Sequence, residues 1–256
     1  MVDERFSFLH VTASLVILII VFVLLVHYFR QKARRSRIQL WQDSLNLTEH
    51  AQVFNQLYAE VDGFSLSRQA RQNQVEDAIE YTYGEIEFFP FVALLSLVNP
   101  DCDTVFYDLG CGVGKAVIAC GMVYPVRKSV GVEILPELYA SACSQVQKLA
   151  ANPDYRERTE HIQIIKSNIL DADLDLREAT LIFINSTTFF GTTWEKVNSL
   201  LSHLPLIKTV ITTSKPLQNS DFTRINSTKL QMSWGVVPVF IHVRKQILTN
   251  WLENIE

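Results

Sequence analysis

The chain has 256 residues, 48% of them apolar and 20% charged, which leaves room for one sizeable folded domain and an appendage. Its four cysteines form no C-x-x-C pair and its six histidines are scattered, so the sequence predicts no metal site. Residues 1–37 hold six of the 23 basic and two of the 27 acidic residues, so residues 38–256 carry a net charge of −8. This negative charge disfavours nucleic acid as a partner.

The first predicted element is an apolar helix over residues 6–29, which contain no Asp, Glu, Lys or Arg. About 20 apolar residues suffice to cross the hydrocarbon core of a membrane. A cleavable signal peptide would begin with basic residues, whereas here the basic cluster, residues 30–37, follows the apolar run. The positive-inside rule then predicts a single-pass membrane anchor with the rest of the chain on the cytoplasmic side. A buried core helix is the alternative.

Residues 30–80 form the next predicted segment, a basic juxtamembrane run followed by a helical lead-in. The basic run suits anionic lipid headgroups. Apolar residues between positions 40 and 61 recur at helical spacing and predict two or three helices with a break near "DGFS". The apolar stretch "FFPFVALLSLV" predicts one more helix.

From Thr104 onward, apolar strand patterns alternate with helical ones. The predicted strands cover residues 104–110, 128–134, 161–168, 179–186 and 206–214, and the helices 115–125, 136–151 and 192–204. Such alternation implies a parallel sheet covered on both faces. Two further strands, 228–235 and 236–245, predict an antiparallel hairpin. The fold class is therefore α/β, a Rossmann-like seven-stranded sheet with an antiparallel C-terminal hairpin. This ending resembles that of the class I methyltransferases, and the domain is expected over residues 81–256.

The stretch "DLGCGVGK" follows the first predicted strand and places Asp108, Gly110, Gly112 and Gly114 in one strand-to-helix turn. The spacing does not fit a P-loop, and Lys115 occupies the third glycine position of a dinucleotide fingerprint. What remains is a turn that approaches an adenosyl–amino acid ligand closely, because glycine has no Cβ.

Glu133 lies at the tip of the second predicted strand, 19 residues after Gly114. An acid at this position can accept both ribose hydroxyls, and ligands of open α/β sheets lie beyond the strand C-termini. The sequence therefore predicts S-adenosylmethionine as the cofactor.

The motifs "YGEI", "DLGCGVGK", "GVEI", "IFINS", "SKPL", "RINS" and "SWG…VFIH" occur in the order seen in the Dot-one (disruptor of telomeric silencing) lysine methyltransferases. The chain resembles this family from Tyr81 to Val243. The resemblance places Tyr83 and Glu85 in the loop that closes over the methionine end of the cofactor, and Asp108 at its amino group. Asn168 stands where the family reads adenine with an aspartate, and Asn185 lies by the transferred methyl group.

The chain departs from the family around the acceptor. Ser186 replaces a second asparagine, "TTF" replaces "FAF", and Lys115 replaces a glutamine. Phe240 and Val239 stand where the family has tyrosines that line the lysine channel, so the resemblance makes Phe240 a candidate catalytic residue beside Asn185. The alternative for Phe240 is a core residue of the last strand.

Together these features predict a membrane-anchored, S-adenosylmethionine-dependent protein-lysine N-methyltransferase. The expected partner is a protein with an accessible lysine, membrane-associated or cytoplasmic, rather than the nucleosome, because the body of the chain is acidic. Two alternatives stay open: a methyltransferase for a lipid-soluble small molecule, and an inactive scaffold with the cofactor fold.

Overall fold

The structure is a computed structural model that describes residues 2–72, 83–187, 189–247 and 249, with the side chains described from residue 18 onward. The predicted start of the methyltransferase domain, residues 81–82, and its end, residues 250–256, lie outside the described residues. The chain divides into two compact units, Met1–Thr48 and Glu49–Glu256. Each is described by itself.

The first unit consists mainly of one helix, α1 (Val2–Ser44). It continues without interruption from the predicted apolar span into the basic segment. In the part of the chain with described side chains, no helix meets the length and hydropathy needed to cross a membrane. The predicted span begins at Phe6, and the side chains of its residues 6–17 lie outside the described ones.

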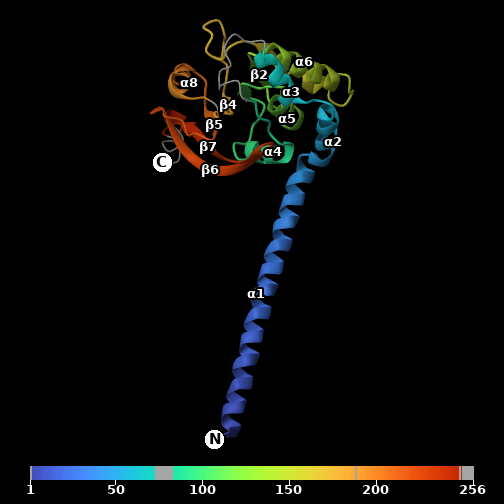
Figure 1. Cartoon of the computed structure of the whole chain (residues 1–256), viewed down its shortest axis with the longest axis vertical. Helices are drawn as coiled ribbons and strands as arrows, with labels where there is room; N and C mark the ends of the chain where they lie inside the picture. The colour runs from blue at the N-terminus through green and yellow to red at the C-terminus, as the bar shows by residue number, and fades with distance from the viewer. Residues whose placement is uncertain (1, 73–82, 188, 248, 250–256) are drawn as a thin grey trace. The chain divides into compact units, whose positions relative to one another are not determined.

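The second unit, drawn in Figure 1, is built on a seven-stranded sheet, and its strands have the order β3-β2-β1-β4-β5-β7-β6. The first five strands are parallel, and β7 is antiparallel to both β5 and β6. The strands are β1 (Val105–Leu109), β2 (Lys128–Glu133), β3 (Ile162–Lys166), β4 (Leu181–Ile184), β5 (Thr209–Thr213), β6 (Phe222–Met232) and β7 (Gly235–Arg244). The predicted seven-stranded sheet with a C-terminal antiparallel hairpin is confirmed.

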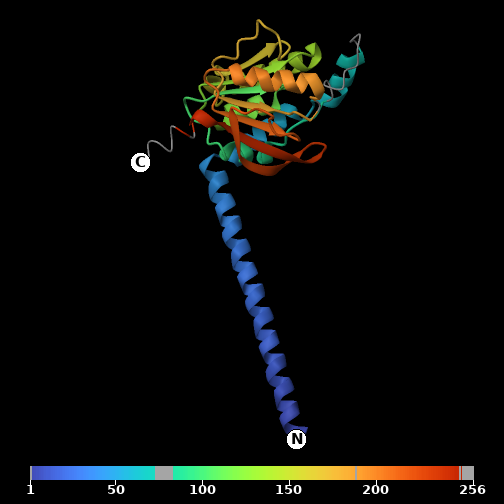
Figure 2. The ribbon, with the colours of Figure 1, turned by 90° about the vertical axis from the view of Figure 1, so that its left-hand side faces the viewer.

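Helices cover both faces of the sheet, and β1, β2 and β4 are therefore buried on both sides. One face carries α4 (Phe88–Ser96), α5 (Lys115–Val123) and α6 (Pro136–Ala150), and the other carries α8 (Gly191–His203), as Figure 2 shows for the orange helix. The remaining helices are α2 (Leu47–Tyr58), α3 (Gly63–Gln72) and α7 (Arg156–Thr159). The helical lead-in breaks between Tyr58 and Gly63, where the sequence predicts it.

The order of the strands reverses between β1 and β4, because the chain first builds outward to β3 and then returns to the other side of β1. The crevice beyond the C-terminal ends of these two strands is where open α/β sheets bind their ligands. The glycine turn follows β1 and Asn185 follows β4, so the fold brings both to this crevice.

Candidate active site

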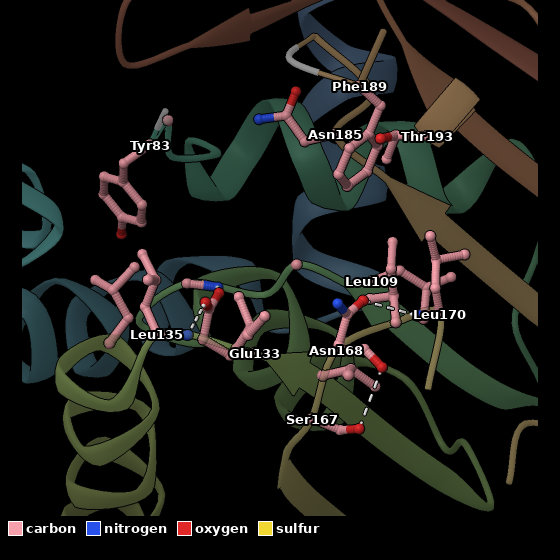
Figure 3. Close-up of a pocket in the computed structure, with 17 residues that line it drawn as sticks. Tyr83, Leu109, Glu133, Leu135, Ser167, Asn168, Leu170, Asn185, Phe189 and Thr193 are labelled. Atoms are coloured by element: carbon pink, nitrogen blue, oxygen red, sulfur yellow. Dashed lines mark hydrogen bonds between the residues drawn. The ribbon is translucent and has the colours of Figure 1, made fainter. Parts of the chain in front are cut away.

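A cavity of about 310 Å³ lies at this strand reversal. Figure 3 shows Tyr83, Asn185 and Phe189 on one side of it and Glu133 and Asn168 on the other. Most of the predicted cofactor residues therefore meet in one place. A second, smaller cavity of about 20 Å³ continues past Tyr83 and Asn185 and is lined by Glu85, Asp108 and Lys115 as well.

The glycine turn and Glu133 are tied together by hydrogen bonds. The carboxylate of Glu133 accepts the backbone N–H of Gly112 and the backbone N–H of Leu135, each at 2.8 Å. Glu133 is 6% exposed, and this burial raises the pKa of its carboxyl. Two backbone donors thus hold the carboxylate at the cavity, where its remaining lone pairs can accept ribose hydroxyls.

Gly112 shows why this turn requires glycine. Its φ of +58° lies in the left-handed region, and a Cβ there would come within 2.4 Å of the Tyr83 ring. The missing side chain lets Tyr83 lie directly on the turn. At Gly110 a Cβ would meet no atom within 4 Å, so this position faces open space along the cavity.

Asp108 is the last polar residue of β1 and is 4% exposed. Burial, with the nearby charge of Glu133 as a second cause, raises the pKa of Asp108 to about 8. A positively charged group entering the smaller cavity would favour the ionised carboxylate. Asp108 therefore suits an ammonium ligand better than a neutral one.

The loop before α4 is held over the smaller cavity by a polar cluster. Glu85 accepts a hydrogen bond from the Tyr83 hydroxyl at 2.7 Å and forms an ion pair with the Lys115 ammonium at 2.6 Å. The same ammonium lies 5.1 Å from the centroid of the Tyr58 ring. Lys115, known from the sequence only as a departure from the family, thus joins the loop to the start of α5.

The tip of the β6–β7 hairpin holds the same loop from the other side. Ile86 pairs with Met232 in an isolated antiparallel bridge, and the N–H of Ser233 donates to the carbonyl of Glu85 at 3.0 Å. The Trp234 ring lies so close to Gly84 that a Cβ there would come within 2.1 Å of it. The loop is therefore effectively an extension of the sheet.

At the opposite end of the larger cavity, Asn168 lies in the turn after β3. Its amide oxygen accepts the N–H of Leu170 at 2.9 Å, and Ile169 and Leu170 line the cavity beside it. One lone pair of the oxygen is left for a donor such as an adenine amino group. Asn168 therefore stays the predicted contact for adenine.

Asn185 lies where the two cavities meet, directly after β4. Its amide oxygen accepts hydrogen bonds from the hydroxyls of Thr187 at 2.8 Å and Thr213 at 2.7 Å. The protein itself therefore already supplies two donors to this oxygen. The threonine contacts could not be predicted from the sequence, because they depend on how the ends of β4 and β5 align.

Phe240 does not join the site. Among the described residues, neither cavity is lined by Phe240, which lies in the middle of β7 with the Arg224 guanidinium 5.7 Å from its ring centroid. Phe240 pairs with Thr212 on β5, whereas the residue of β5 that donates a hydrogen bond to Asn185 is Thr213. Since successive residues of a strand point to opposite faces, this one-residue difference turns the ring away from Asn185. Phe240 is half-buried, whereas its neighbours Val239 and Ile241 belong to the buried core, so Phe240 is not a fully buried core residue either.

Residues 65–245 match the family described as histone methylation protein DOT1. The chain belongs to this family. A relative from Saccharolobus islandicus (strain REY15A), named protein-lysine N-methyltransferase, is 32% identical over 89 residues, 35% of this chain and 50% of the relative. The Caenorhabditis elegans "Histone-lysine N-methyltransferase, H3 lysine-79 specific" is 29% identical over 152 residues, 57% of this chain and 16% of that protein. The matches thus span half or less of these relatives.

Solved structures match parts of the chain at low similarity. An RNA methyltransferase from Salinibacter ruber in complex with S-adenosyl-L-homocysteine matches with a TM-score of 0.45 and 19% identity, covering 60% of this chain and 90% of that one. A putative RNA methyltransferase from Pyrococcus horikoshii matches with a TM-score of 0.46 and 12% identity, covering 72% and 98%.

S-adenosylmethionine is the cofactor of the DOT1 family, and the residues of this cavity fit it. Asn168 with its apolar neighbours would hold adenine, Glu133 the ribose and Asp108 the ammonium, while Tyr83 and Glu85 cover the methionine end. The order of these groups along the two cavities follows the order of the groups in the cofactor.

The raised pKa of Asp108 predicts that cofactor affinity depends on pH. Since a bound ammonium lowers the pKa of Asp108 below its value of about 8 in the free protein, binding releases a proton and affinity increases as pH rises. We expect affinity to increase about tenfold between pH 6 and pH 7.5, measured by calorimetry in buffers of different ionisation enthalpy. In the matched Asp108→Asn variant most of this dependence should disappear. Equal affinity at both pH values in the unmodified protein would contradict the assignment.

Proposed function

We propose that this protein transfers a methyl group from S-adenosylmethionine to a lysine side chain of a protein. The observation that carries the proposal is the match to the DOT1 family over residues 65–245, because it contains the residues that line the cavity. The relative named protein-lysine N-methyltransferase supports the same acceptor class. The cavity itself supports a ligand with an adenosyl group at one end and an amino acid at the other.

When bound, S-adenosylmethionine supplies a methyl group on a positively charged sulfur; the lysine amine forms the new N–C bond as the S–C bond breaks, and water takes the proton. The residues of the chain align and enclose the reactants. Glu133 and Asp108 anchor the ribose and the ammonium, and the loop with Tyr83 and Glu85 keeps water from the methionine end. Asn185 and Phe189 border the space for the amine. Alignment and exclusion of water of this kind account for much of the acceleration of a displacement reaction.

The acceptor that we propose is a protein other than the nucleosome. The chain outside residues 1–37 carries a net charge of −8, so it lacks the overall basic charge that holds phosphate backbones. A membrane-associated or cytoplasmic protein with an accessible lysine meets no such repulsion.

Methyl labelling tests the acceptor class. Tritiated S-adenosylmethionine is added to the full-length protein together with membrane and cytosolic fractions, and the products are separated into protein and lipid. We expect label in protein, recovered as methyl-lysine after hydrolysis. Label in the lipid fraction would favour a lipid-soluble small molecule as the acceptor. Cofactor binding without any transfer would favour an inactive scaffold.

We also propose that residues 6–29 anchor the protein in a membrane, with the second unit on the cytoplasmic side. The run lacks charged residues, and the basic residues that follow it fit the positive-inside rule. The large apolar side chains over residues 18–25 are 48–69% exposed on α1. A helix that is apolar on every side is stable where lipid or another apolar surface covers it.

The anchor predicts that the full-length protein stays in the membrane pellet after carbonate extraction. In the matched variant Leu18→Arg/Ile20→Arg, each charge costs about 2.5–3.5 kcal/mol near the centre of a span, so this protein should move to the supernatant. Release of the unmodified protein by carbonate would contradict the anchor. Protection of the second unit from external protease in sealed cells would support the orientation.

A further inference from the structure

A cluster of hydroxyl groups surrounds the amide of Asn185. Besides Thr187 and Thr213, which both contact the amide oxygen, Ser214 lies 2.8 Å from the Thr187 hydroxyl. Ser186 donates to the backbone carbonyl of Thr213, and both residues are fully buried. The cluster therefore joins the end of β4 to the end of β5 at the side of the cavity.

The amide oxygen of Asn185 lies toward the two threonine hydroxyls, and this placement sets the orientation of the cluster. Each hydroxyl has one proton to donate, and an amide oxygen has two lone pairs. Thr187 and Thr213 give their protons to Asn185, so the contact between Ser214 and Thr187 must be donated by Ser214. Both lone pairs of the Asn185 oxygen are then used. Its NH₂ group is left to face the cavity, and Figure 3 shows the amide nitrogen on the side of Tyr83.

We propose that Thr187 and Thr213 are positioning residues that fix the Asn185 amide with its NH₂ group, rather than its oxygen, toward the bound reactants. The inference rests on the proposed function of this cavity. Asn185 then acts as a hydrogen-bond donor to an oxygen atom of the acceptor protein, and it does not compete for the protons of the lysine amine. Without the two hydroxyls, the amide could rotate by 180° with almost no change in shape.

Isosteric variants test the orientation. Thr213→Val and Thr187→Val each remove one hydroxyl and keep the side-chain shape, and each should lower kcat about tenfold while the dissociation constant of S-adenosylmethionine changes less than about threefold. Thr213→Ser should restore most of kcat. The matched control is Thr212→Val, which removes an equally buried hydroxyl on the same strand that donates to the carbonyl of Lys215 instead. A fall in kcat for Thr212→Val as large as for Thr213→Val would overturn the proposal.

Asn185→Asp identifies the working atom, because aspartate keeps the shape and the acceptor oxygens but has no NH₂ donors. We expect its kcat to fall as far as that of Asn185→Ala, and a kcat near that of the unmodified protein would refute the orientation. The side-chain ¹⁵N–¹H signal of Asn185 gives a readout that does not need activity. It should shift in Thr213→Val and Thr187→Val but not in Thr212→Val, even if the protein transfers no methyl group to lysine. Absence of label in protein would thus count against the proposed function alone, whereas an unshifted signal would count against the positioning role.

Discussion

Replacing Asn185 with alanine is expected to lower the rate of methyl transfer about a hundredfold, the scale expected when one positioning contact is lost. The cofactor should still bind within a few-fold of its normal affinity, because Glu133, Asp108 and Asn168 remain in place around the cavity. Single-turnover transfer at saturating S-adenosylmethionine, with binding measured on the same preparation, separates these two effects.

Phe240→Tyr serves as the comparison for Asn185→Ala. The ring of Phe240 lies in β7 outside both cavities, so adding a hydroxyl should change the rate of transfer only slightly. If Asn185→Ala turned over normally, Asn185 would be only a residue at the end of a strand. The lysine acceptor would then have to bind in a different geometry.

Replacing Glu133 with alanine should weaken S-adenosylmethionine binding more than tenfold, because charge-assisted hydrogen bonds of about 1.5–3 kcal/mol each are lost. The structure adds a second cost. The N–H groups of Gly112 and Leu135 lose their acceptor, which should lower the free energy of unfolding by about 1–3 kcal/mol and loosen the glycine turn. Calorimetric titration and thermal unfolding measure the two effects separately.

Glu178→Ala is a matched control for Glu133→Ala. Glu178 forms an ion pair with Lys128 at 2.7 Å and lines neither cavity at the strand reversal, so this variant should bind the cofactor normally. If Glu133→Ala bound S-adenosylmethionine with unchanged affinity, the carboxylate of Glu133 would not be the contact of the ribose.

The sheet could be predicted from the sequence because each buried strand forms a short apolar run between polar turns. The same regularity placed Glu133 at the tip of β2 and Asn185 at the end of β4. The first half of β6 escaped prediction. Residues 223–229 lie in an edge strand and are mostly exposed, so they show no apolar alternation.

The contacts that complete the site could not be predicted from the sequence, for a different reason. The ion pair between Lys115 and Glu85 joins residues 30 positions apart, and the contact between Asn185 and Thr213 joins residues 28 positions apart. Such pairs depend on the exact alignment of neighbouring segments. A difference of one residue in that alignment, as between Thr212 and Thr213, also decided that Phe240 faces away from Asn185.

The bridge between Ile86 and Met232 sets an order of events during synthesis of the chain. Ribosomes add about 5–20 residues per second, so Met232 follows Ile86 by about 7–30 s. During that interval the loop with Tyr83 and Glu85 has no hairpin to hold it. The cover over the methionine end is therefore completed only after Met232 has been added. Tight retention of the cofactor is expected only once the final hairpin has left the ribosome.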